Sequence, residues 1–276
     1  MKILVSGARG FIGRNLISVL KKAGHHVFTL KAFHADVGCL ENQIHHLNDE
    51  FQLLQNSFCD IDVFVHLAWM DTNNWNSDAH LNINEPLSRY LIEYLAFRDV
   101  RHIIVVGTCL EYGGEGELNE SMEALPNNNY ALAKYELYKN LRRIARKKNF
   151  TLTWLRLFYV YGGDQPPNTL FGSLKQHITQ EASFFDMSLG QQIRDYLHID
   201  LVSQRLAAVI LSKKEFDVLN LCSGEGRALE SHVRSWITQI DIDNKIELKL
   251  GTLPYRDDEP FALWGSSEKF EQLVNL

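Results

Sequence analysis

Short apolar runs alternate with longer segments of helical period through the first half of this chain. The apolar runs are Ile3–Ser6, Val27–Leu30, Val63–Ala68, Ile103–Gly107 and Leu152–Phe158, and the helical segments are Asn15–Ala23, Leu87–Phe97 and Tyr130–Lys147. Such alternation is typical of βαβ units around a parallel sheet. Apolar runs without polar alternation are typical of strands buried on both faces. The sequence therefore predicts an α/β fold with a doubly wound parallel sheet.

The pattern changes after residue 162. Gly162–Asn168 is rich in the turn formers Gly, Pro and Asn, and shorter segments follow it. We therefore expect a main domain over residues 1–162 and a smaller, interleaved lobe over residues 163–276. Some later segments, such as Val218–Leu221, are candidates to return to the main sheet.

Composition and charge exclude several classes of protein. With 276 residues, 45% of them hydrophobic, the chain can bury a core without disulfides. Its cysteines show no paired spacing, so we expect neither a disulfide framework nor a metal site. A net charge of -6 argues against nucleic-acid binding, and the basic run Lys139–Lys148 is interpreted as a solvated helix face. Apolar runs are too short for a signal peptide or a membrane span, so we expect a cytoplasmic protein without a membrane partner.

A glycine-rich turn follows the first apolar run and precedes the first helical segment. Its glycines permit a tight turn and a close approach of backbone amides to a pyrophosphate at the positive end of a helix. The alternative is an ordinary turn between strand and helix. The context favours a Rossmann-type, dinucleotide-binding domain. The expected cofactor contacts in this turn are Gly7, Arg9, Gly10, Phe11, Ile12 and Gly13.

Lys31 stands at the end of the second apolar run, where a carboxylate would bond the ribose 2′-hydroxyl of NAD and repel a 2′-phosphate. A lysine there, with Arg9 in the glycine turn, favours NADP(H), and NAD(H) is the alternative. The alternative is that Lys31 is a solvated surface lysine and that other residues set the cofactor preference. Asp36 and Val37 are expected to form a short third strand beside the adenine, or else a surface turn.

Tyr130 and Lys134 have a spacing of four residues at the start of a helical segment, which places both side chains on one helix face. An ammonium near a phenol stabilises the phenolate and moves the pKa of the tyrosine toward the working range of a general acid or base. Thr108 follows the fourth apolar run, so its hydroxyl is expected near Tyr130. The alternatives are a coincidental spacing and a threonine that caps a strand.

In combination, these motifs resemble the extended short-chain dehydrogenase/reductase family, in particular its NAD-dependent epimerase/dehydratase branch of nucleotide-sugar enzymes. Most of the chain takes part in the resemblance. The matching positions are Gly7, Gly10 and Gly13, His66-Leu67-Ala68, the triad Thr108, Tyr130 and Lys134, Leu155-Arg156 with Tyr161-Gly162, and Arg194-Asp195-Tyr196 with His198 and Asp200.

The resemblance implies further site residues and a quaternary structure. Leu67, Ala68, Trp69 and Phe158 would join Tyr130 and Lys134 at the cofactor, and Met70, Thr108, Glu111, Tyr159, Arg194 and Arg256 would contact a nucleotide-sugar substrate. The two arginines would hold its diphosphate, because guanidinium groups bind phosphate in a bidentate way. The alternative for each arginine is a structural salt bridge. A homodimer through the Leu87–Phe97 and Tyr130 helices is typical of the family.

Departures from the family pattern narrow the expected reaction. Cys109-Leu110 replaces the Asp-Glu pair of the dehydratases, which argues against dehydration. Tyr159 and Lys31 stand where epimerases often carry Asn and an acidic residue. We therefore expect an NADPH-dependent reductase of the 4-keto group of a nucleotide-linked 4-keto-6-deoxyhexose. The alternatives are a nucleotide-sugar 4-epimerase with bound NAD and a non-catalytic NADP-sensing regulator.

Overall fold

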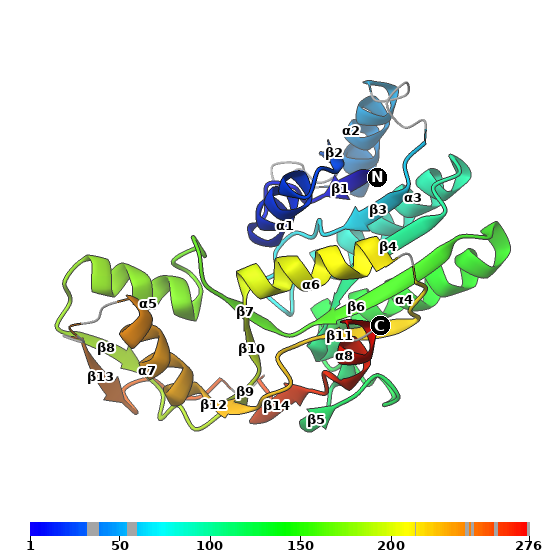
Figure 1. The fold of residues 1–276 in the computed structure, drawn as a ribbon. Coiled ribbons are helices and arrows are strands. Elements are labelled where there is room, and N and C mark those ends of the chain that lie inside the picture. Colours follow the sequence, from blue (N-terminus) through cyan, green and yellow to red (C-terminus); the bar gives the residue numbers. More distant parts are fainter. Residues whose placement is uncertain are drawn as a thin grey trace.

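The computed structural model describes residues 1–31, 39–53, 60–212, 214–240, 243, 246–256 and 259–274. Its centre is a six-stranded sheet with the order β11-β6-β4-β3-β1-β2, in which all neighbouring strands are parallel (Figure 1). The strands are β1 (Lys2–Ser6), β2 (His26–Leu30), β3 (Val63–His66), β4 (His102–Thr108), β6 (Thr151–Leu157) and β11 (Val218–Leu221). The predicted parallel α/β sheet is confirmed.

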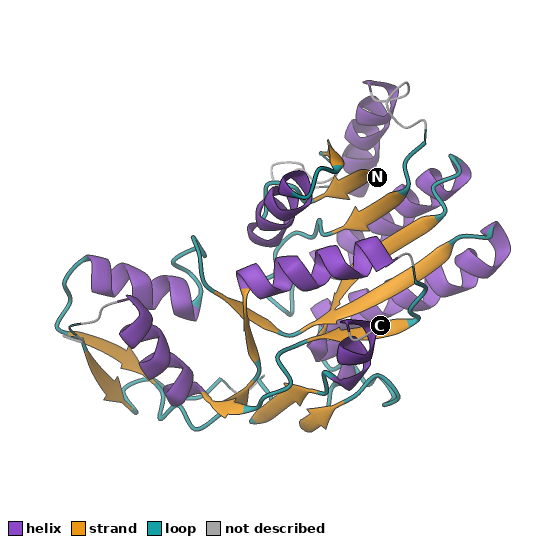
Figure 2. Cartoon of the chain, in the orientation of Figure 1, coloured by secondary structure: helices purple, strands orange, loops and turns teal. Residues whose placement is uncertain are grey.

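Helices cover both faces of this sheet (Figure 2). One face carries α1 (Phe11–Lys22) and α6 (Ile199–Ser212). The other face carries α2 (Leu40–Leu53), α3 (Glu85–Phe97) and α4 (Asn129–Lys148). The sheet is therefore doubly wound, as the buried apolar strands predict.

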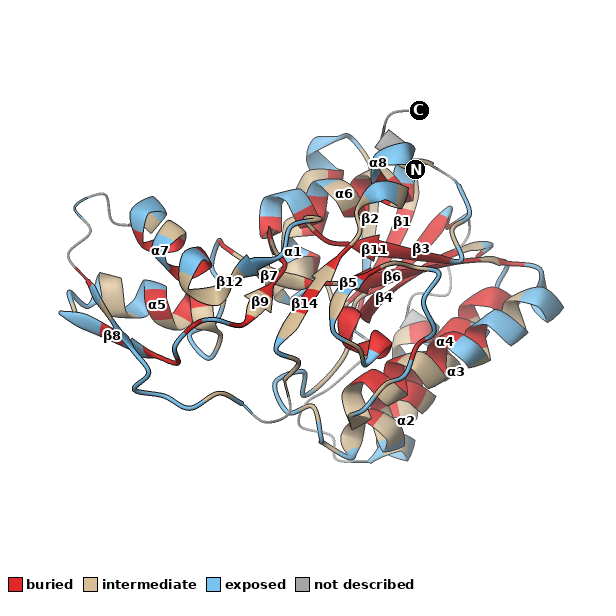
Figure 3. Ribbon diagram, turned by 90° about the horizontal axis from the view of Figure 1, so that it is seen from below, coloured by how far each residue is buried: buried red, intermediate tan, exposed pale blue. Residues whose placement is uncertain are grey.

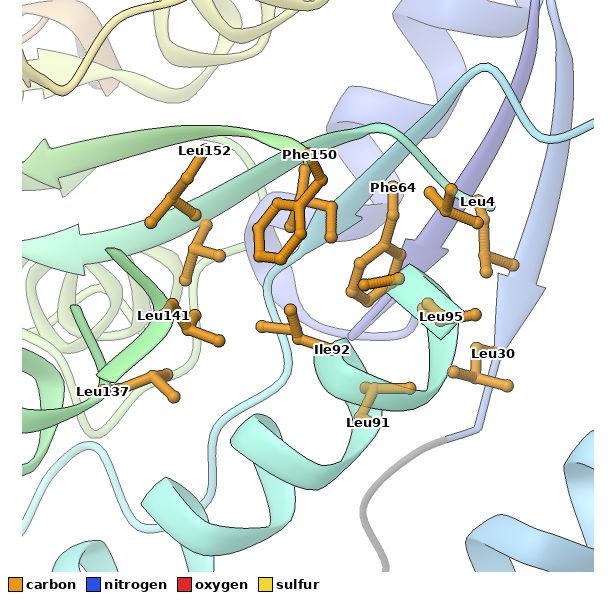
Figure 4. Packing of buried hydrophobic residues seen from close by; sticks show 14 of the residues in the cluster. Leu4, Leu30, Phe64, Leu91, Ile92, Leu95, Leu137, Leu141, Phe150 and Leu152 are labelled. Atoms are coloured by element: carbon orange, nitrogen blue, oxygen red, sulfur yellow. The ribbon is translucent and has the colours of Figure 1, made fainter. Parts of the chain in front are cut away.

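Successive residues of a strand supply the two cores in turn. Leu4 packs on the side of α3 and α4, whereas Ile3 and Val5 pack on the side of α1 and α6. Figure 4 shows the first of these cores, with Leu4, Phe64 and Leu152 from strands facing Leu91, Ile92, Leu95, Leu137 and Leu141 from helices. The red interior in Figure 3 marks the same buried layers. Burial of each large apolar side chain contributes about 1.5–3 kcal/mol.

The chain changes direction across the sheet between β1 and β3. It runs from β1 to β2 at the sheet edge and then crosses back to β3 on the other side of β1. Open α/β sheets bind ligands at such a switch point, beyond the carboxyl ends of the strands. Gly7 follows β1 and Ala68 follows β3 at this point, and a Cβ on Gly7 would lie only 2.6 Å from the Ala68 nitrogen.

A smaller lobe, formed mostly by the chain after β6, contains three short sheets, with the orders β10-β7, β12-β9-β14-β5 and β13-β8 (Figure 1). Its strands are β5 (Gly116–Leu118), β7 (Tyr159–Tyr161), β8 (Phe184–Met187), β9 (Ile193–Arg194), β10 (Tyr196–His198), β12 (Arg227–Ala228), β13 (Glu247–Leu250) and β14 (Ala262–Gly265). The helices α5 (Leu170–Thr179) and α7 (Leu229–Ile240) pack together here.

The two parts of the chain are interleaved. β5 precedes residue 162 but pairs with β14, whereas α6 and β11 follow residue 162 and pack in the main domain with the last helix, α8 (Glu268–Val274). The buried Asp195 carboxylate joins three segments, because it accepts hydrogen bonds from the backbone amides of Ser223, Gly224 and Gly265. Within the described residues, no helix has the length and apolar character needed to cross a bilayer.

Candidate active site

The glycine turn presents backbone amides at the start of α1. Gly7 has a φ of +74°, and Gly10 donates a backbone hydrogen bond of 3.0 Å to the Gly7 carbonyl. A Cβ on Gly13 would lie 2.2 Å from that carbonyl oxygen, so only glycine lets the helix sit this close to the turn. The first turn of α1 carries no acidic residue and no side-chain cap. Its amides and positive helix end therefore fit the pyrophosphate of a dinucleotide.

A buried histidine supports the strands on either side of the switch point. His66 Nδ1 and Ser6 Oγ share a hydrogen bond of 2.7 Å, and His66 Nε2 and Ser88 Oγ share one of 3.0 Å. Burial and, to a smaller extent, the nearby Lys134 ammonium lower the pKa of His66 to about 3. His66 is therefore a neutral bridge between β1, β3 and α3.

Thr108 and Tyr130 come together at the carboxyl end of β4. Thr108 ends this strand, and Tyr130 lies in the first turn of α4, which begins where the Asn128 side chain accepts a 2.9 Å hydrogen bond from the Ala131 amide. The Tyr130 amide donates to the Trp75 carbonyl over 2.8 Å. The side chains of Tyr130 and Thr108 share a hydrogen bond, which by itself lowers the pKa of Tyr130. The structure thus brings the predicted pair into contact.

Lys134 lies one helical turn after Tyr130 and is 3% exposed. Its Nζ donates a 2.7 Å hydrogen bond to the Val106 carbonyl and lies 3.8 Å from the centre of the Trp69 ring. Burial lowers the pKa of Lys134 to about 7. The ammonium is held against the same strand end that carries Thr108.

The pKa of Tyr130 differs from the sequence expectation. The spacing of Tyr130 and Lys134 predicts that the ammonium lowers the pKa of the phenol. In the structure, burial raises the pKa of Tyr130 above its ordinary value, and Glu111 and Cys109 add to the increase. Desolvation outweighs the lowering effect of the Thr108 hydrogen bond, because the phenol is removed from water. The phenol is thus a protonated hydrogen donor.

The loop after β3 is built around Trp69. The Trp69 indole nitrogen donates to His80 Nδ1 over 3.0 Å, and its ring packs edge-on against Tyr130 at 6.2 Å between centres. His80 begins a π-helical turn, η1 (His80–Asn84), whose Asn84 side chain bonds both the amide and the carbonyl of Met70. Trp69 is therefore fixed against Tyr130 and Lys134, and Asn84 holds Met70 next to it in the same loop.

Glu111 lies inside the protein rather than facing a cleft. It belongs to a short 3-10 turn, η2 (Cys109–Tyr112), and is fully buried. Its carboxylate accepts hydrogen bonds from the Thr108 amide at 2.8 Å, Trp154 Nε1 at 3.0 Å and Arg156 Nε at 3.0 Å. The substrate contact expected from the sequence is not supported, because protein donors occupy both carboxylate oxygens.

The two arginines expected at a diphosphate both contact Glu259. Arg194 is 2% exposed and donates from Nη2 to Glu259 Oε2 over 3.0 Å, whereas Arg256 is exposed and donates to Oε1 over 3.1 Å. Tyr159 lies alongside, with its ring centre 5.5 Å from the Arg194 guanidinium carbon. Its hydroxyl oxygen is buried and has no hydrogen-bond partner among the described residues. These side chains form one polar cluster in the lobe.

An open pocket of about 380 Å³ lies between the start of α4 and this lobe. Its lining residues are Asn76, Gly113, Glu115, Asn127, Asn128, Glu259 and Pro260. Asn128 caps the helix that carries Tyr130, and Glu259 belongs to the arginine cluster. The pocket therefore adjoins both the start of the helix that carries Tyr130 and the arginine cluster.

A sequence model of the NAD dependent epimerase/dehydratase family matches residues 3–222. The chain belongs to this family. Two enzymes of Aggregatibacter actinomycetemcomitans are similar to it. The dTDP-6-deoxy-L-talose 4-dehydrogenase (NAD(+)) is 27% identical and the alignment covers 96% of this chain and 100% of the relative. The GDP-6-deoxy-D-talose 4-dehydrogenase is 23% identical, with 98% and 90% covered.

Two solved structures of 4-epimerases have the same fold as this chain. The UDP-N-acetylglucosamine 4-epimerase from Methanobrevibacter ruminantium M1 has a TM-score of 0.79 at 19% identity, over 99% of this chain and 91% of that chain. The UDP-glucuronic acid 4-epimerase from Bacillus cereus, in complex with UDP-glucuronic acid and NAD, has a TM-score of 0.77 at 23% identity, over 100% and 93%. The resemblance inferred from the motifs is confirmed.

Within this family assignment, the remaining predicted residues have different surroundings. Phe11, Ile12 and Leu67 are partly buried beside the core under α1 and α6, and Phe158 is buried near Cys109 and Cys222. Arg9 and Lys31 are exposed. Asp36 and Val37 lie outside the described residues. Their assignment to the cofactor stays a prediction.

Sequence reasoning missed His80 and Asn84. They orient Trp69 and Met70 through hydrogen bonds that span 11 and 14 residues. No local pattern marks these contacts, because a π-helical turn has neither the helical nor the strand period. Their only sequence signal is that two polar residues stand four positions apart, and in the structure these two are the buried residues of the turn.

The burial of Lys134 makes a testable prediction about stability. Its pKa is about 7 in the folded chain and 10.5 ordinarily, so between these values the unfolded chain binds more protons and the stability of the wild type rises with pH. Lys134→Met removes this dependence. We expect the Tm of the variant, relative to the wild type, to be higher at about pH 6.5 than at about pH 9.5. Thermal unfolding of both proteins at the two pH values measures this difference in Tm.

The matched control is Lys147→Met, because Lys147 is exposed on the same helix. Its Tm difference from the wild type should be the same at both pH values. A Tm difference for Lys134→Met that does not change with pH would contradict the buried, perturbed ammonium.

Proposed function

We propose that this chain is an NADPH-dependent reductase of the 4-keto group of a nucleotide-linked 4-keto-6-deoxyhexose. The observation that carries the proposal is the convergence of Thr108, Tyr130 and Lys134 at the end of β4, next to the strands whose turns present Gly7 and Ala68. Two similar enzymes are named 4-dehydrogenases of 6-deoxytalose nucleotides, and reduction of a 4-ketone is the reverse of such a reaction.

Each residue has a defined task in this proposal. The bound dinucleotide would supply the hydride to the ketone carbon. Tyr130 holds the proton that the ketone oxygen receives, and its raised pKa keeps the phenol protonated for this purpose. Thr108 orients the same oxygen by a hydrogen bond. Lys134 places a positive charge beside the developing alkoxide and offers donors to the ribose of the dinucleotide.

The lobe would hold the rest of the substrate. Arg194 and Arg256 present guanidinium donors around Glu259, and a diphosphate could exchange for this carboxylate with charge-assisted hydrogen bonds. The buried, unpartnered Tyr159 hydroxyl adds a donor to the same cluster. Polar lining by Asn76, Asn127 and Asn128 suits hydroxyl groups in the adjoining pocket.

A 4-epimerase is the second candidate, because several similar solved structures are 4-epimerases. The two activities differ in their need for added cofactor.

We therefore propose to incubate the purified protein with a panel of nucleotide-linked 4-keto-6-deoxyhexoses and NADPH, and separately with nucleotide sugars alone. NADPH oxidation that depends on the keto sugar supports the reductase. Interconversion of a nucleotide sugar without added NADPH supports the epimerase and contradicts the reductase. A non-catalytic sensor would show neither.

The role of Tyr130 is tested by Tyr130→Phe. Loss of the hydroxyl removes the proton donor, so turnover should fall at least about tenfold while the Kd for NADPH changes little. Steady-state kinetics and NADPH fluorescence titration measure the two quantities. Tyr135→Phe on the same helix is the matched control and should keep wild-type turnover. Undiminished turnover of Tyr130→Phe would overturn the assignment.

The cofactor preference is tested by Lys31→Asp. An aspartate at the end of β2 repels a 2′-phosphate, so the variant should lose affinity for NADPH by about tenfold or more and lose little for NADH. Titration with both dinucleotides measures the ratio of Kd values. Lys147→Asp, a charge reversal on an exposed part of α4, should leave this ratio unchanged. Equal losses for both dinucleotides in Lys31→Asp would remove the argument for NADP(H).

A further inference from the structure

Glu111 is the fully buried carboxylate at the end of β4. Its partners Arg156 and Trp154 come from β6, and Arg156 is itself 3% exposed. Gly107 makes room for it, since a Cβ there would lie 2.2 Å from Glu111 Oε1. A buried ion pair adds little net stability compared with apolar packing of the same volume. Stability alone therefore gives no reason for a charge at this position.

Glu111 and Lys134 hold the same short stretch of backbone. The Lys134 ammonium donates to the Val106 carbonyl at 2.7 Å, and the Glu111 carboxylate accepts from the Thr108 amide at 2.8 Å. A positive and a negative side chain are thus hydrogen-bonded to the backbone of β4 at positions two residues apart. The second of these positions is Thr108, whose hydroxyl contacts Tyr130. A movement of the Glu111 carboxylate would therefore displace Thr108 and the end of β4 to which Lys134 is hydrogen-bonded.

The other described groups around Lys134 provide no counter-charge. His66 on β3 and His80 on η1 have lowered pKa values and are neutral, and Tyr130 on α4 has a raised pKa and is also neutral. Trp69 contributes the face of its ring. Among the described residues, Glu111 is the one carboxylate that raises the pKa of Lys134 against the effect of burial.

We propose that Glu111 is a positioning residue for the reaction: its buried carboxylate fixes the end of β4 for Thr108 and serves as the counter-charge of the Lys134 ammonium. This role rests on the proposed function for its catalytic consequence, but its electrostatic part concerns the protein alone. Glu111 acts through Thr108 and Lys134 and touches no reacting atom.

The test is Glu111→Gln, which keeps the size of the side chain and an acceptor oxygen but removes the charge. With less stabilisation of the ammonium, Lys134 should titrate at a lower pH than in the wild type. Lysine labelled with ¹³C at the ε-carbon reports this titration by NMR without substrate, and the Lys134→Met spectrum assigns the signal. Glu117→Gln on β5, an exposed matched control, should leave the titration unchanged.

Kinetics supply the second readout. For reduction of the keto sugar, kcat/KM should fall with rising pH as Lys134 loses its proton, and in Glu111→Gln this fall should occur at lower pH. At a pH near 7, kcat should decrease about tenfold or more, whereas KM should change little. An unchanged pH profile with lowered protein stability would mean that Glu111 is only structural, and would overturn the proposal.

Loss of one partner leaves Arg156 unpaired, so Glu111→Gln carries a risk of misfolding. The double variant Glu111→Gln/Arg156→Met removes both buried charges and should still lower the pH at which Lys134 titrates. If Lys134 titrates as in the wild type in whichever variant folds, the proposal is overturned. If the titration shifts but the wild type reduces no keto sugar, the proposed function fails while the counter-charge role stands.

Discussion

The buried ammonium of Lys134 is the constraint around which the active end of the sheet is organised. Removal of a charge from water costs several kcal/mol, and a protein offsets this cost only with well-placed partners. Here the partners come from separate parts of the chain: the Val106 carbonyl, the Trp69 ring and, more distantly, the Glu111 carboxylate. The Glu111 carboxylate also accepts from the Thr108 amide, and the Trp69 ring also packs against Tyr130. Because the Lys134 ammonium needs all of these partners, it holds the end of β4, the loop after β3 and the turn after β4 in a fixed arrangement.

The same arrangement explains why Tyr130 departs from simple expectation. A phenol beside an ammonium in water would be acidified, yet burial raises its pKa here and lowers that of Lys134 toward 7. Burial therefore keeps the phenol protonated and lets the Lys134 ammonium lose its proton near neutral pH. A ligand that enters the site changes those surroundings, so the proton balance of the pair depends on what is bound. This sensitivity suits a site that passes a proton to a substrate oxygen.

Much of the fold was predictable from short-range patterns. The apolar runs and helical periods predicted the doubly wound sheet, and the spacing of Gly7, Gly10 and Gly13 predicted the turn at the start of α1. Glu111 shows where such reasoning ends. The family resemblance suggested a substrate contact for it, but Trp154 and Arg156, more than forty residues away, turn its carboxylate inward. An interleaved lobe was expected from the sequence, but the pairing of β5 with β14 was hidden, because these strands meet only when the chain is folded.

The sequence by itself determined the class of fold and the family, because strand and helix periods and motif spacings are local properties of a chain. The tertiary structure alone decided which side chains are removed from water and which charges face one another. Those contacts join residues that are distant in sequence, and desolvation depends on everything that packs around a group. The protonation of Tyr130 and Lys134, and the inward role of Glu111, follow from that packing.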